Sequence, residues 1–87
     1  MPRISAFYGI AIYMYWNEGD HATPHFHAHQ GGQRASISVD GGILAGALEA
    51  RALSRAREWA GLHRGELLAN WERARRFEPL EAIAPLP

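Results

Sequence analysis

The apolar residues of this chain change their spacing near residue 48, and this change constrains the fold more than any other feature. Before it, residues 34–40 alternate polar and apolar side chains with a period of two, as a strand with one buried face does. After it, in residues 49–76, apolar side chains recur every three or four positions, as on the buried face of a helix. The sequence therefore predicts a sheet followed by helical structure.

Three or four antiparallel strands are expected in the first half of the chain. Residues 8–16 are rich in aromatic and β-branched side chains, and a proline precedes the candidate strand 25–29. A glycine pair then forms a turn into residues 34–40, and residues 43–48 are the candidate fourth strand. Because these connections are short, the strands should follow one another as a meander.

The second half is expected to form one long helix or a kinked pair of helices over residues 49–77. Gly61 and Gly65 weaken the helix and mark the place for a bend. Residues 78–87 contain three prolines, so they should form an extended tail packed on a surface. We therefore predict a single α+β domain of residues 1–87: a sheet in residues 1–48, with the helix packed on one of its faces.

Alternation along the predicted strands assigns each side chain to one of two faces. A helix needs an apolar surface to cover, so it should pack against one set of residues. This set is Ile10, Ile12, Met14, Phe26, Ile37 and Val39. The opposite face then carries polar and aromatic side chains, and we predict that it is the working surface. These are Tyr13, Tyr15, His25, His27, His29, Ser36, Ser38 and Arg34.

Composition excludes several classes of protein. The chain has no cysteine, which excludes disulfides, thiolate nucleophiles and cysteine-ligated zinc. No stretch has the roughly 18 apolar residues that span a membrane, and the first residues do not resemble a secretory signal. A cytoplasmic protein without a membrane partner is therefore expected. A chain of 87 residues buries a modest core, so a homo-oligomer or a partner protein is a natural expectation.

Four of the five histidines lie between His21 and His29, and three interpretations compete for them. In the first, His21, His25 and His27 bind a divalent transition metal such as zinc or nickel through neutral imidazole nitrogens. In the second, the polar face is a surface for docking a protein partner, and the protein is a non-enzymatic interaction or regulatory module.

The third interpretation is acid–base chemistry on RNA, as in a small ribonuclease-like hydrolase. Histidine titrates near neutral pH, so His25 and His27 suit proton transfer, and Arg34 suits a phosphate contact. Tyr13 and Tyr15 on the same face suit stacking on bases. His63 is a supporting candidate, because Glu66 follows it by three residues on the predicted helix.

Several motifs together resemble a bacterial family known as domain of unknown function 4160. They are the start "MPRISAFYGIAIYMYW", the core "PHFHA", the helix "EWAGLHRGELLANWE" and the "EPL" of the tail. The resemblance singles out His21, His25 and His27 and sets His29 aside. It implies a gene often found beside a second small gene, in an arrangement similar to a toxin–antitoxin pair. This protein is then the toxin-like effector, and the neighbouring gene product is its partner.

Overall fold

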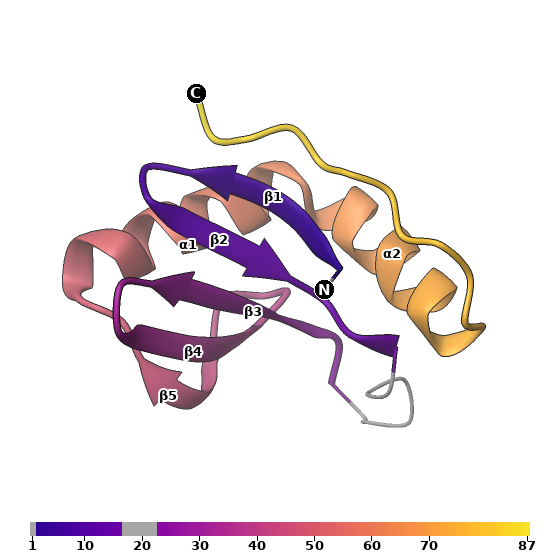
Figure 1. Ribbon diagram of the computed structural model, residues 1–87, viewed down its shortest axis with the longest axis horizontal. Coiled ribbons are helices and arrows are strands. Elements are labelled where there is room, and N and C mark those ends of the chain that lie inside the picture. Colours follow the sequence, from indigo (N-terminus) through magenta and orange to yellow (C-terminus); the bar gives the residue numbers. More distant parts are fainter. Residues whose placement is uncertain (1, 17–22) are drawn as a thin grey trace.

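The computed structural model describes residues 2–16 and 23–87, which form a five-stranded antiparallel sheet and two helices (Figure 1). The strands are β1 (Arg3–Phe7), β2 (Ile10–Tyr13), β3 (His25–Gln30), β4 (Gln33–Ser38) and β5 (Ile43–Ala47). The helices are α1 (Ala50–Leu62) and α2 (Arg64–Arg75). The sheet order β1-β2-β3-β4-β5 confirms the α+β meander, but the expected three or four strands were too few.

The additional strand arises from a turn within a segment that reads as one continuous strand. Tyr8 and Gly9 both have positive φ, 50° and 77°, and they fold β1 back onto β2. Two consecutive residues with positive φ are typical of the tightest hairpin turns. A tyrosine rarely adopts this conformation, so the sequence predicted a strand through residues 8–16 where the structure has a turn and a shorter strand.

The hydrophobic core lies between one face of the sheet and the two helices, which are behind the sheet in Figure 1. All six strand residues that were expected to face the helix are at most 4 % exposed. The helices bury a seam of mostly small residues against them: Ala52, Ala56, Trp59, Ala60, Leu67, Trp71 and Ala74. Neither helix in the described part of the chain is long and apolar enough to cross a membrane.

The predicted bend between the helices falls at His63. This residue leaves helical geometry (φ −120°, ψ 28°) and stands at the junction of α1 and α2. Its backbone stays hydrogen-bonded on both sides, because its N–H donates to Trp59 O and its carbonyl accepts from Leu67 N–H. The bend therefore changes the helix direction without leaving this residue's backbone groups unsatisfied.

The tail, residues 78–87, packs on the molecule's own surface along the outer edge of β1 (Figure 1). Ile83 N–H donates to Ile4 O at 2.8 Å, and the side chains of Ile83 and Leu86 are buried. Trp59 Nε1 donates to Ala84 O at 2.8 Å. Backbone and side-chain hydrogen bonds thus hold an extended segment that proline prevents from becoming helical.

Asn70 makes the most complete connection between the helices and the tail. Its side chain is fully buried, and its Nδ2 donates to Glu81 O at 2.8 Å. In return, Glu81 N–H donates to Asn70 Oδ1 at 3.0 Å. The side-chain amide therefore pairs with the tail as a neighbouring strand would, and satisfies both backbone groups of one tail residue.

We predict that Asn70→Ala destabilises the protein by about 2 kcal/mol or more, because it leaves the Glu81 backbone groups without partners. Urea unfolding followed by circular dichroism measures this loss. Glu81→Ala is the matched control: it removes an exposed carboxylate, 3.6 Å from Arg73, but keeps the backbone that Asn70 binds. Its cost should stay below about 1 kcal/mol. Equal effects of the two variants would contradict the role given to Asn70.

Two glycines should respond to alanine with opposite signs. Gly46 in β5 has φ +77°, and a Cβ there would lie 2.2 Å from Arg34 O, so Gly46→Ala should destabilise by about 2 kcal/mol or more. Gly61 in α1 has nothing within 4 Å of the place where a Cβ would stand, so Gly61→Ala should stabilise by up to about 1 kcal/mol. Thermal unfolding of both variants tests this; a stabilising Gly46→Ala would show that the close approach is not a constraint.

Candidate functional site

Cross-strand pairing builds two rows of side chains on the sheet face that the helices leave uncovered. In the first row, Tyr13, His27, Ser36 and Ala45 lie directly opposite one another on successive strands. In the second, the sequence of partners is Ala11, His29, Arg34 and Ala47. Directly opposed residues of an antiparallel sheet point to the same side. The polar face predicted from alternation is therefore assembled as expected around His27 and Arg34.

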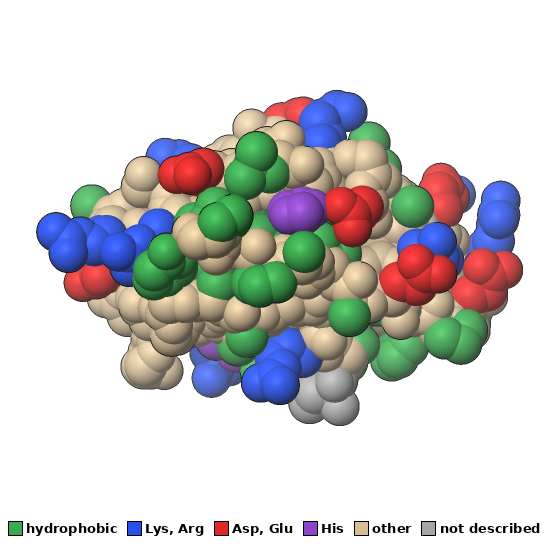
Figure 2. Space-filling view, turned by 90° about the horizontal axis from the view of Figure 1, so that it is seen from above, with side chains coloured by type: hydrophobic (Ala, Val, Ile, Leu, Met, Phe, Trp, Pro, Cys, Tyr) green, Lys and Arg blue, Asp and Glu red, His purple; other side chains and the backbone are tan. Residues whose placement is uncertain are grey.

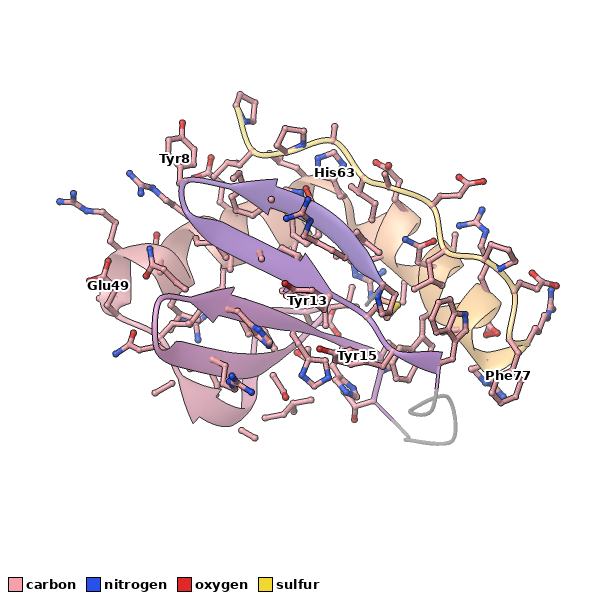
Figure 3. All side chains as sticks on the ribbon, viewed as in Figure 1. Tyr8, Tyr13, Tyr15, Glu49, His63 and Phe77 are labelled. Atoms are coloured by element: carbon pink, nitrogen blue, oxygen red, sulfur yellow. The ribbon has the colours of Figure 1, made fainter. Side chains whose placement is uncertain are left out.

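Aromatic contacts connect the tyrosines to the histidines of this face. The ring of Tyr13 lies 4.7 Å from that of His29, and the ring of Tyr15 lies 4.8 Å from that of His27. Tyr13 and Tyr15 are parallel to each other, with ring centroids 6.3 Å apart, and Figure 3 labels Tyr13 at the end of β2 and Tyr15 just beyond it. The histidine rings thus contact a pair of aligned aromatic rings.

A pocket of about 200 Å³ opens beside these rings, between β3, β4 and β5. His27, His29 and Arg34 supply its polar groups, and the remaining lining is small: Ala35, Ser36, Ala45 and Gly46. Ser36 Oγ lies 3.2 Å from His27 Nδ1 and holds that ring by a hydrogen bond. Because Ala45 and Gly46 have little or no side chain, β5 forms a low rim that leaves the pocket accessible.

The sheet carries no negative side chain. None of its five strands contains aspartate or glutamate, while β1 contributes Arg3 and β4 contributes Arg34. Charges of both signs are interspersed on the side of the molecule shown in Figure 2, seen from above. The formal charge of the whole chain is zero, but among the strand residues the charged side chains are arginines, with histidines beside them on β3. Such a face favours anions.

His29 belongs to this site, although the family resemblance set it aside. It is partly buried, and its backbone lies directly opposite Arg34. Partial burial first, and then the positive charge of Arg34 and the proximity of His27, lower the pKa of His29 below 6.5. The imidazole is therefore mostly neutral near pH 7 and is able to accept a proton. From the sequence, the expected pairing of His29 with Arg34 across the hairpin could have indicated that His29 belongs to this site.

His25 does not face the solvent, in contrast to the prediction. It is only 4 % exposed, and its ring packs 5.1 Å from the ring of Trp71 on α2. Its Nδ1 lies 2.9 Å from Thr23 O, and its ring centroid is 5.3 Å from that of His27. The alternation of β3 was interpreted correctly, but the bulky Trp71 covers the first residue of the strand. The buried ring of His25 thus packs edge-on against the ring of His27.

His63 lies away from the sheet face, so the structure does not bring it together with His27 and Arg34. Figure 3 shows it beside the tail, far from Tyr13 and Tyr15. Its Nδ1 is 2.6 Å from Glu66 Oε1, and its ring is 5.8 Å from that of Trp59. These contacts describe a histidine at the edge of the core, held by one strong hydrogen bond at the helix junction.

Two of the three proposed metal ligands lie within the described residues, and the third does not. His21 lies outside the described residues, whereas His25 and His27 each use Nδ1 in a contact with a protein oxygen. Within residues 2–16 and 23–87, no group of three or more histidine or acidic side chains is arranged to hold a metal ion. The described residues thus supply two neighbouring imidazoles and no third ligand.

These features define a small α+β protein with one sheet face covered by helices and one open face that carries His27, His29 and Arg34. The chain belongs to the family described as domain of unknown function DUF4160, which matches residues 9–72. The match includes β2 to β5 and most of both helices, whereas the first strand and the tail lie outside it. No curated protein and no solved structure matches the chain.

We predict that Arg34→Gln raises the pKa of His29, because it removes a positive charge that disfavours the imidazolium form. Following the His29 ring signals by NMR as the pH is varied measures the change directly. Arg51→Gln, on the exposed side of α1, is the matched control and should leave the pKa of His29 where it is. An unchanged or lower pKa in Arg34→Gln would show that the guanidinium does not act on this ring.

Proposed function

We propose that the protein is a metal-independent, ribonuclease-like effector that binds single-stranded RNA on its open sheet face. One observation carries this proposal: His27, His29 and Arg34 line one pocket between strands that contain no acidic residue, beside two parallel tyrosines. Two proton-transferring groups and a cation around one cavity are a set that can cleave a phosphodiester without a metal ion.

A single strand suits this surface better than a duplex. Aromatic side chains bind unpaired bases by stacking, worth about 1–3 kcal/mol per base, and they need the base to be exposed. Tyr13 and Tyr15 present such rings next to the pocket. Duplex-binding proteins usually carry a large basic surface, whereas this face has two arginines among its strands.

The pocket residues divide the chemistry between them. His29, with its lowered pKa, removes the proton from the ribose 2′-hydroxyl, whose oxygen attacks the adjacent phosphorus. His27, held by Ser36, gives a proton to the 5′-oxygen as the P–O bond breaks, leaving a 2′,3′-cyclic phosphate. Arg34 pairs with the phosphate oxygens as their negative charge increases. His29 thus replaces His25 in this scheme, because His25 is buried.

In the cell, such an activity fits the effector of a two-protein module, as the family resemblance implies. The neighbouring gene product would then bind this protein and keep the open face from RNA. A metal-binding role for the histidines is the main alternative, and it predicts that EDTA abolishes any activity.

We predict that purified protein without a histidine tag cleaves a single-stranded RNA oligonucleotide in the presence of EDTA. His27→Ala and His29→Asn should each lower the rate by about 10²–10⁴-fold, the usual contribution of general acid–base catalysis. The rate should fall as the pH drops through the lowered pKa of His29, because protonation removes the base. Expression of the wild type should arrest growth, and His27→Ala should abolish the arrest while still folding.

His63→Asn is the matched control, since it removes a histidine that lies outside the open face. It should retain the cleavage rate, with folding of all variants checked by circular dichroism. A 2′-deoxy oligonucleotide should bind but resist cleavage, because it lacks the attacking hydroxyl. Cleavage that EDTA abolishes and zinc restores would instead favour the metal-binding alternative. A loss of cleavage rate in His63→Asn equal to that in the His27 and His29 variants would contradict the catalytic role given to the pocket.

A further inference from the structure

The two edges of the sheet are protected to different degrees. The outer edge of β1 is occupied by the tail, whose Ile83 N–H donates to Ile4 O. The opposite edge is β5, the last strand in the sheet order, and no other described segment pairs along its outer side. An uncovered edge strand presents backbone donors and acceptors that can pair with another strand.

The composition of β5 does not discourage such pairing. All five residues, Ile43–Ala47, are exposed, and none is charged or is a proline, the residues that usually block edges. Ile43 and Leu44 are 42 % and 50 % exposed, so the strand also offers apolar side chains. Two irregularities exist: Leu44 is an extra residue opposite Ser36 and Ile37, a bulge of the kind that can protect an edge, and Gly46 has a positive φ of 77°. Residues 45–47 nevertheless pair with β4 in regular register.

We propose that β5 pairs antiparallel with β5 of a second copy of this chain, so that one sheet continues through both molecules. A two-fold interface requires a surface that complements itself, and an uncharged strand meets its own copy without like-charge repulsion. The two ends of β5 also match: the bulky Ile43 and Leu44 of one copy lie beside the small Gly46 and Ala47 of the other. A small chain gains buried surface in this way.

Pairing of this kind brings two candidate sites together. The two-fold axis of an antiparallel strand pair is perpendicular to the sheet, so both open faces lie on the same side. Ala45 and Gly46 form the rim of the pocket, and each rim therefore borders the second copy. The two pockets become neighbours on one continuous face. The interface itself does not depend on RNA binding, so either proposal can fail alone.

Sedimentation velocity over a range of protein concentrations tests the pairing. A five-residue strand buries less than a stable interface does, so we expect a dimer that forms between about 10 µM and 1 mM. Leu44→Lys places like charges near the axis and should raise the dimer Kd at least tenfold. Phe77→Lys replaces another exposed apolar residue, far from β5, and should leave the Kd unchanged. A wild type that stays monomeric overturns the proposal, as does equal weakening by both variants.

Cross-linking provides a second test that needs no loss of stability. The chain has no cysteine, so single-cysteine variants at positions 43, 44, 45 and 47 report on the interface alone; Gly46 is left out because a Cβ there would lie 2.2 Å from Arg34 O. Residues facing each other across an antiparallel pair have Cα atoms about 4.5–5.5 Å apart, within disulfide range. Oxidation should give a covalent dimer most readily at the central position, Ala45→Cys, and less toward the strand ends. Equal cross-linking at all four positions and in a Phe77→Cys control overturns the pairing.

Discussion

Each side chain of β3 has to face either the hydrophobic core or the open side of the sheet, and the rest of the molecule depends on this constraint. Phe26 and Ala28 are fully buried under the helices, so His27 and His29 are placed on the other side. A slip of one residue would put two imidazoles in the core and expose Phe26, at a cost of several kcal/mol. The same packing that stabilises the core therefore presents the histidines.

The second requirement is that only one face of the sheet is covered. Both helices and the tail pack on the Phe26 side, and the Asn70 amide fixes the tail by pairing with the Glu81 backbone. Trp59 contributes to both layers, because its ring contacts Phe26 while its Nε1 binds Ala84 O. The tail thus completes the core and covers the edge of β1. It leaves the open face and β5 accessible, so both are available for the roles proposed for them.

The sequence predicted what alternation controls and failed where a single residue departs from its usual behaviour. The six buried strand residues and the grouping of His27, Arg34 and the tyrosines followed from spacing, and the bend at the helix junction followed from Gly61 and Gly65. β1 was missed because Tyr8 adopts a positive φ that its side chain gives no reason to expect. His25 was misplaced because Trp71, forty-six positions further along the chain, covers it. Such a contact between distant residues cannot be inferred from local pattern.

The charges around the pocket and the small residues of β5 belong to neighbouring parts of the same sheet. Partial burial first, and then the charge of Arg34 and the proximity of His27, lower the pKa of His29, and none of the strand residues is an acid that would oppose this effect. In the proposed function this imidazole is the base and Arg34 holds the phosphate. The adjacent strand β5 has small residues at the positions where a bulky side chain would close the pocket. Small residues at that rim are compatible with both proposals, because they leave room for an extended anionic ligand and for the close approach of a second copy. A strand that only had to end the sheet would gain more from charged side chains there.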